Sequence, residues 1–198
     1  MKIKVLISTG GSGGHVLPAI TIYDHLKSRY ETLISTDLRG LKYLDKENYK
    51  SIIINTPRLN NIFLLPFVFL KVLFLTIKCL ITLKKEKVSI LISTGGYMSL
   101  PLCMAAKLLN IKIFLIEPNM VLGRANKFFL NFSKKLLCYS NNLINLPKKF
   151  EQKKIIIKPL IREKYYQKNN LQKIDSIFTI IIIGGSQGAK IFDNLIKE

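Results

Sequence analysis

Three glycine-rich segments in the sequence have the composition of phosphate-binding loops. They are residues 10–14, 94–97 and 184–188, and His15 directly follows the first of them. Each follows an apolar run and precedes a stretch that favours helix. Glycine permits positive φ and close approach of the backbone to a ligand. The start of the next helix adds free N–H groups and the positive end of its dipole. A phosphate or diphosphate is therefore the ligand these segments favour.

His15 is the residue beside these loops that could act as a base. It lies where the first glycine loop meets its predicted helix. At the positive end of a helix dipole an imidazole is favoured in its neutral form, which can accept a proton. Judged by position alone, a capping or loop histidine is the more ordinary role. His25, in the middle of the same predicted helix, is expected to be structural.

The sequence lacks the motifs of several other classes of enzyme and binding site. The loops match neither GxGxxG nor the P-loop pattern with Lys-Ser/Thr, which argues against a dehydrogenase or an NTPase. Cys79, Cys103 and Cys138 are odd in number, widely spaced and set in apolar runs. They predict neither a zinc site nor a disulfide framework and fit a reducing cytosol. We expect no metal and no cofactor.

The elements that would position the loops alternate along the chain. We expect strands at residues 3–8, 32–35, 51–54, 90–93, 113–116, 136–138 and 155–157. We expect helices at residues 17–28, 63–84, 100–109 and 122–132. The strands are continuous apolar runs, as in strands covered on both faces. Alternating strands and helices predict an α/β fold with a doubly wound, parallel, Rossmann-like sheet. Ligands then bind at the carboxyl ends of the strands.

Composition divides the chain into three parts. Residues 1–162 form a Rossmann-like domain, and residues 163–176 are polar and predict a linker. Residues 177–198 contain an apolar strand, the third glycine loop and the start of a helix, which is the first βα unit of a second Rossmann-like domain. One strand and one helix cannot bury a core alone, so we expect this second domain to be truncated.

Charge and one long apolar segment raise the question of a membrane. The net charge of +19 favours anionic partners such as acidic lipids, phosphorylated substrates or nucleic acid. Residues 62–83 are almost wholly apolar and long enough for a span. Lys71 and Lys78 oppose this, since each costs about 2.5–3.5 kcal/mol near a bilayer centre. With Lys85 they form one helical stripe, which favours surface association or ordinary packing over a span.

Four motifs in order along the chain resemble those of the MurG family of N-acetylglucosaminyltransferases. Residues 10–19, GGSGGHVLPA, resemble its signature GGTGGHxxPA. Residues 94–101, TGGYMSLP, resemble its second loop, GGYxSxP. Residues 117–127, from Glu117-Pro118-Asn119 to Asn126-Lys127, resemble its EQN segment. Residues 184–189, GGSQGA, resemble its third loop.

The resemblance implies a glycosyltransferase B fold in which the first domain receives a lipid-linked acceptor and the second holds UDP-N-acetylglucosamine. The reaction would transfer N-acetylglucosamine, with inversion, to the 4-hydroxyl of undecaprenyl-diphospho-muramoylpentapeptide (lipid I), giving lipid II for peptidoglycan. The implied location is peripheral, on an anionic membrane surface at the cytoplasmic face of the bacterial inner membrane. No nucleic acid is expected as a partner.

Individual positions can be carried over from the family. Those matching contacts to UDP-N-acetylglucosamine are Ser12, Gly13, Gly14, Asn119, Arg162 and Ser186. Gly95, Gly96 and Tyr97 would bind the acceptor diphosphate. His15 is the candidate general base, taking the proton of the attacking 4-hydroxyl. Pro118 replaces the family's usual glutamine, and residues 158–162 match its GNPxR segment only loosely.

Other functions stay open. The chain could be another transferase of the same fold, or the acceptor-domain subunit of a split glycosyltransferase B enzyme that recruits its donor domain from another chain. It could be a non-catalytic anion-binding or nucleic-acid-binding module, although it lacks the interleaved aromatic and basic residues of single-strand binders. It could also be a bitopic membrane protein anchored by residues 62–83.

Overall fold

The computed structural model describes residues 2–45, 47–57 and 65–162. Residues up to Leu160 form one compact unit, and a second unit begins at Ile161. The predicted linker at 163–176 and the predicted βα unit at 177–198, with the third glycine loop, lie outside the described residues. Those two predictions, and the position of the domain boundary, stay predictions.

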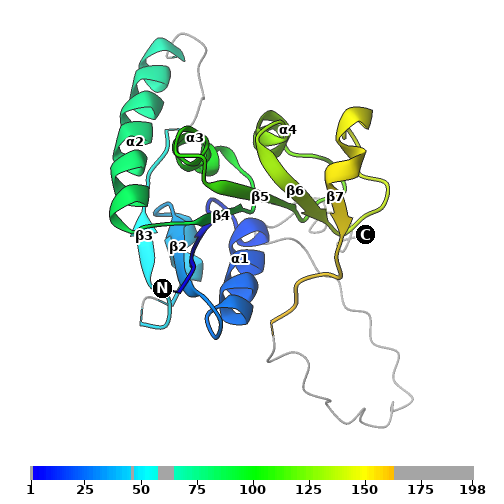
Figure 1. The fold of residues 1–198 in the computed structure, drawn as a ribbon, viewed down its shortest axis with the longest axis horizontal. Coiled ribbons are helices and arrows are strands. Elements are labelled where there is room, and N and C mark those ends of the chain that lie inside the picture. The colour runs from blue at the N-terminus through cyan, green and yellow to red at the C-terminus, as the bar shows by residue number, and fades with distance from the viewer. Residues whose placement is uncertain (1, 46, 58–64, 163–198) are drawn as a thin grey trace, which may run out of the picture. The chain divides into compact units, whose positions relative to one another are not determined.

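A seven-stranded sheet forms the centre of the first unit (Figure 1). Its strands are β1 (Lys4–Ser8), β2 (Glu31–Thr36), β3 (Ser51–Ile53), β4 (Ile90–Ser93), β5 (Lys112–Glu117), β6 (Ser133–Cys138) and β7 (Lys154–Ile156). The order across the sheet is β3-β2-β1-β4-β5-β6-β7, and every neighbouring pair is parallel. The predicted doubly wound parallel sheet is confirmed.

Helices cover both faces of this sheet, which explains why its central strand β1 is buried on both sides. Successive residues of β1 point to opposite sides: Leu6 belongs to one buried cluster, and Val5 and Ile7 to another. The Leu6 cluster includes residues of α2 (Leu65–Lys85), α3 (Leu100–Leu108) and α4 (Arg124–Phe129). The other cluster includes α1 (Gly13–Leu26). Figure 1 shows α1 on one side of the sheet and α3 and α4 on the other.

The helix bounds differ from those expected most clearly in α1 and α4. α1 begins at Gly13, four residues before the predicted start at 17. Ser12, with φ −122° and ψ 161°, takes the capping position, and its carbonyl accepts the N–H groups of His15 and Val16. Glycine is a poor helix former, so composition alone placed the start too late. α4 ends at Phe129 and is shorter than the predicted 122–132.

Within the described residues, three short 3₁₀ segments connect these elements and were not predicted. They are η1 (Gly40–Tyr43), η3 (Tyr97–Ser99) and η4 (Lys148–Lys153). The first two follow the carboxyl ends of β2 and β4, so they shape the edge of the sheet at which ligands bind in this class of fold.

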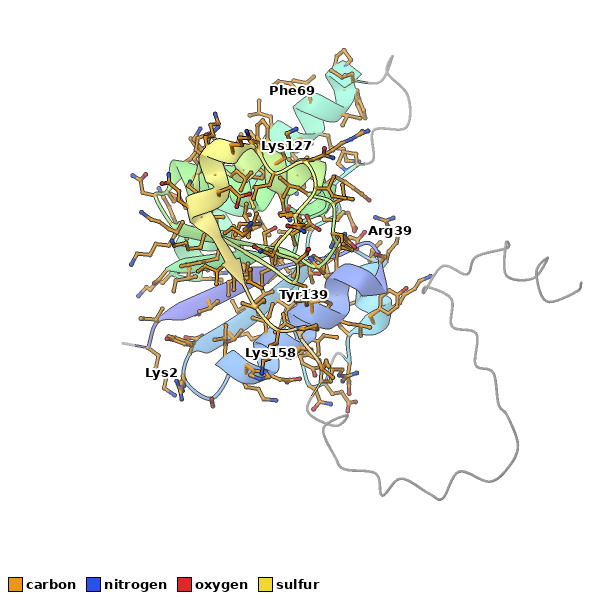
Figure 2. All side chains as sticks on the ribbon, turned by 90° about the vertical axis from the view of Figure 1, so that its right-hand side faces the viewer. Lys2, Arg39, Phe69, Lys127, Tyr139 and Lys158 are labelled. Atoms are coloured by element: carbon orange, nitrogen blue, oxygen red, sulfur yellow. The ribbon has the colours of Figure 1, made fainter. Side chains whose placement is uncertain are left out.

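The long helix α2 buries only a narrow stripe of its surface. Thr76, Cys79 and Leu83 are buried, and the helix packs against α3. By length and composition α2 could cross a membrane. Only 11% of its most apolar window is buried within the described structure, so α2 is not a core helix. Its large exposed apolar residues are Leu65, Phe67, Phe69, Leu70, Leu73, Phe74, Ile77 and Ile81. Figure 2 shows Phe69 on the part of α2 that extends beyond the other helices.

Candidate active site

The order of the strands reverses between β1 and β4, the place at which open α/β sheets form a ligand-binding crevice. From β1 the chain passes to β2 and β3 on one side, and it then returns to place β4 on the other side of β1. Ligands of open α/β sheets bind outside the carboxyl ends of the strands at such a reversal. The first glycine loop follows β1 and the second follows β4, so the fold brings both predicted loops to this crevice.

The first glycine loop leads into the positive end of α1. Gly11 has φ +84°, which favours glycine, and its N–H donates to Asp37 Oδ1 at 2.8 Å. The first turn of α1 contains no acidic residue. Ser12, Gly13 and Gly14 therefore surround a helix start whose dipole is available to a negatively charged group.

His15 points its ring at the second glycine loop. Its Nδ1 lies 2.7 Å from the carbonyl oxygen of Thr94. A carbonyl oxygen only accepts hydrogen bonds, so Nδ1 carries the proton and Nε2 of the neutral ring keeps a lone pair. A Cβ added to Gly96 would lie 4.0 Å from Nε2. The contact with Thr94 thus fixes the tautomer and leaves the basic nitrogen beside Gly96.

The second glycine loop requires glycine for two reasons. Gly95 and Gly96 have φ values of +87° and +80°, a region that other residues rarely adopt. A Cβ on Gly95 would also lie 3.0 Å from Nδ2 of the buried Asn126. The loop therefore passes close to Asn126 and then delivers Tyr97 to the start of η3.

Glu117 organises the next loop, after β5. Its side chain is 1% exposed. Oε1 accepts from the side-chain amide of Asn119 at 3.0 Å, and Oε2 accepts from Gly123 N–H at 2.8 Å and from Asn126 Nδ2 at 2.9 Å. Because these donors occupy both oxygens, the carboxylate holds Asn119 and Asn126 in place and is not a free base.

A pocket of about 530 Å³ opens where these loops meet. It is lined by His15, Gly96, Tyr97, Leu100, Glu117, Asn119, Gly123, Arg124, Ala125 and Phe128. Arg124 is exposed and forms no ion pair with any other residue in the described part of the chain. Since Glu117 is already satisfied, the pocket offers a base, a cation and apolar walls to a ligand.

The structure brings together only some of the residues predicted from sequence. His15, Gly96, Tyr97 and Asn119 line one pocket, and Gly95, which precedes Gly96, lies close to the side chain of Asn126. Ser12, Gly13 and Gly14 precede His15 but are not part of the pocket wall. Arg162 belongs to the second compact unit and Ser186 lies outside the described residues, so both stay predictions.

Sequence reasoning missed four residues near this site: Asp37, Arg39, Arg124 and Phe128. Asp37 and Arg39 follow β2, whose carboxyl end lies next to that of β1. The parallel sheet had been predicted, so polar residues directly after β2 were a usable signal. Arg124 and Phe128 gave none, because only the turn between β5 and α4 brings them to the pocket.

The cysteines and potential metal ligands lie apart from this chemistry. Burial raises the pKa of Cys79 and of Cys103 to about 12, and burial also raises the pKa of Cys138. All three are free thiols. No group of three or more His, Cys, Asp or Glu side chains that could hold a metal occurs among the residues described.

A model of the glycosyltransferase family 28 N-terminal domain matches residues 5–138. The chain belongs to glycosyltransferase family 28. The match runs from β1 to β6 and so contains the first two glycine loops, His15 and the loop after β5. The resemblance seen in the motifs is confirmed.

A curated relative carries a more specific name than the family model. A protein of Pelagibacter ubique is named UDP-N-acetylglucosamine–N-acetylmuramyl-(pentapeptide) pyrophosphoryl-undecaprenol N-acetylglucosamine transferase. It is 50% identical to this chain, and the alignment covers all of this chain and 56% of the relative. The chain thus spans about half the length of the curated relatives it matches.

Solved structures share the fold. MurG of Acinetobacter baumannii aligns with a TM-score of 0.65 at 23% identity, over 78% of this chain and 45% of its own. The UDP-GlcNAc 2-epimerase of Neisseria meningitidis, solved with UDP-GlcNAc bound, aligns with a TM-score of 0.57 at 15% identity, over 78% of this chain and 46% of its own. At these sequence identities, the likeness to the two enzymes is evidence for the fold alone.

Proposed function

We propose that this chain binds the acceptor in an N-acetylglucosaminyltransferase of peptidoglycan synthesis. The donor is UDP-N-acetylglucosamine, and the acceptor is undecaprenyl-diphospho-muramoylpentapeptide. The observation that carries the proposal is the placement of His15: its Nε2 keeps a lone pair at a pocket that is also lined by Gly96 and Tyr97 of the second glycine loop. The donor and acceptor chemistry follows the name of the Pelagibacter ubique relative.

The reaction needs one base and one stabilised leaving group. The acceptor 4-hydroxyl oxygen attacks the anomeric carbon of N-acetylglucosamine while the bond from that carbon to the diphosphate oxygen breaks. The electron pair of this bond leaves with UDP, and the hydroxyl proton passes to His15 Nε2. Attack opposite the leaving group inverts the anomeric centre. A positioned general base of this kind contributes about 10²–10⁴-fold in rate.

The acceptor diphosphate needs positive charge and N–H donors near the base. The loop at Gly96 offers backbone that no Cβ covers, and Arg124 adds a guanidinium in the same pocket. Planar guanidinium groups suit phosphoryl oxygens through charge-assisted hydrogen bonds. The walls formed by Leu100, Ala125 and Phe128 are apolar and suit the parts of the acceptor that carry no charge.

The lipid tail of the acceptor accounts for the exposed face of α2. A polyprenyl chain leaves a bilayer only at a high cost in free energy, so the protein must approach the membrane. α2 packs on α3, and Leu100 at the start of α3 lines the pocket. The apolar face of α2 would dock at the cytoplasmic surface of the inner membrane, with Lys71 and Lys78 beside anionic head groups.

Substituting His15 tests the proposal. In the protein at its full natural length, His15→Ala is expected to lower turnover about 10²–10⁴-fold with a soluble acceptor analogue, while the affinity for UDP-N-acetylglucosamine stays nearly unchanged. Steady-state kinetics and calorimetry measure the two quantities.

His25→Ala is the matched control. His25 lies on the same helix, and its Nδ1 also contacts a backbone carbonyl, that of Thr21 at 2.9 Å, but it does not line the pocket. Its removal should leave turnover unchanged. Full turnover of His15→Ala would remove this residue from the mechanism.

A further inference from the structure

The carboxylate of Asp37 connects the first glycine loop to Arg39. Asp37 directly follows β2 and is 4% exposed. Its Oδ1 accepts the N–H groups of Gly11 and Gly40, both at 2.8 Å. Its Oδ2 lies 3.0 Å from Nε of Arg39 and 2.9 Å from Nη2. One oxygen thus binds the loop, and the other binds the guanidinium.

Arg39, labelled in Figure 2, extends this connection to the second glycine loop. Its Nη2 also donates to the hydroxyl of Tyr97. The guanidinium carbon lies 5.6 Å from the centre of the Tyr97 ring, within range of a cation–π interaction. Because Tyr97 forms part of the pocket wall, two side chains from the end of β2 join that wall to Gly11.

The reach of Arg39 exceeds what the local turn needs. The N–H groups of Gly11 and Gly40 already satisfy Oδ1, so Asp37 alone would stabilise the turn into η1. The space around Asp37 is also tight: a Cβ on Gly10 would lie 2.8 Å from Oδ1. The first loop is therefore fixed against Asp37, and Arg39 adds a link to Tyr97 that the turn does not require.

We propose that Arg39 is a positioning residue that sets the distance between the two glycine loops for a diphosphate-linked acceptor. This rests on the proposed function, in which the acceptor diphosphate binds at the second loop beside His15. The guanidinium donates to Asp37 and Tyr97 in two directions at once. A lysine ammonium keeps the charge but lacks this planar fork, so it cannot hold both partners in the same geometry.

A double-mutant cycle tests the proposal. Arg39→Lys, Tyr97→Phe and the double variant are compared at the full natural length of the protein. Each single change is expected to raise the acceptor KM about tenfold, and the double variant should be no worse than the more affected single variant, because both changes break one connection. The KM for UDP-N-acetylglucosamine should stay within about twofold, since the link acts on the acceptor loops.

Arg29→Lys is the control, because Arg29 is exposed and precedes β2 at the opposite edge of the sheet. Effects of the two changes that multiply in the double variant would overturn the proposal. An unchanged acceptor KM in Tyr97→Phe would also overturn it. This variant removes only the hydroxyl oxygen, so it can decide the test even if Arg39→Lys folds poorly. A wild type that transfers no sugar would overturn the proposed function as well, whereas an active wild type with independent variants overturns only this inference.

Discussion

At the scale of single residues, the two charged side chains that line the pocket, Glu117 and Arg124, have different roles. Glu117 is buried, and backbone and side-chain amides occupy both its oxygens. Arg124 lines the same pocket, is exposed, and forms no ion pair with another described residue. The negative charge therefore maintains the loop after β5, and the positive charge remains for a ligand.

Arg124→Ala is expected to weaken acceptor binding. A hydrogen bond to a charged group contributes about 1.5–3 kcal/mol, so the acceptor KM should rise by a factor of about ten or more. Turnover at saturating acceptor should change little, because His15 is untouched. Kinetics with varied acceptor measure this.

Arg29→Ala removes the same charge at the other edge of the sheet and serves as control. If both variants raise the acceptor KM equally, the effect comes from overall charge, and Arg124 has no specific contact with the acceptor.

At the scale of elements, the helix α2 is the feature that the sheet does not explain. A helix of the outer layer needs one buried stripe, and Thr76, Cys79 and Leu83 supply it. Most of its other apolar residues are exposed, among them Phe67, Phe69 and Ile81. Lys71, Lys78 and Lys85 are exposed and lie seven residues apart, on one side of the helix.

Lys71→Glu/Lys78→Glu is expected to reduce binding to acidic liposomes at low salt. Each lysine near an acidic surface contributes about 1 kcal/mol, and salt screens this attraction. A salt-resistant part of the binding should remain, because the apolar face is unchanged. Co-sedimentation with and without acidic lipid measures both parts.

Lys112→Glu/Lys134→Glu changes the net charge equally at the amino ends of β5 and β6 and is the control. Binding of the α2 variant to acidic liposomes as tight as that of the wild type would show that this face is not the membrane contact.

An element could be predicted from the sequence where local residue composition determines it. Central strands such as β1 and β4 were predictable because burial on both faces makes each of them a continuous apolar run. The start of α1 was not, because Ser12 caps the helix through backbone geometry that composition does not reveal.

The site followed the same division. His15 and the glycine loops carry motifs, and the parallel sheet requires their loops to meet at one edge. Asp37 and Arg39 act through contacts across strands, and Arg124 reaches the pocket through the turn before α4. Residue type and spacing alone do not reveal such contacts.

At the scale of the whole molecule, three buried thiols report on the integrity of the fold. Cys79 and Cys103 belong to the cluster between the sheet and the helices α2, α3 and α4, as does Cys138. Burial disfavours the thiolate and raises the pKa of Cys79 and Cys103 to about 12. Because the thiolate is the reactive form, these groups should be inert in the folded protein.

Thiol labelling is therefore expected to be slow at pH 8 and to become fast in denaturant. The folded pKa values lie above the unfolded ones, so the thiols stabilise the fold fully below about pH 9, and this contribution is lost as pH rises towards 12. Labelling with an aromatic disulfide, with and without urea, measures accessibility, and melting between pH 8 and 11 measures the loss. Rapid labelling of all three thiols in the folded protein would contradict the packing described for this cluster.

The most direct measurement of the central claim follows radiolabelled UDP-N-acetylglucosamine with the protein at its full natural length. The same fold occurs in a UDP-GlcNAc 2-epimerase, so the products distinguish two activities. Our account predicts that label moves to the muramoyl acceptor as a β-linked sugar, with release of UDP, and only when the acceptor carries its diphosphate. Conversion of the nucleotide sugar to its 2-epimer without acceptor, or no transfer to the diphosphate-linked acceptor, would contradict it.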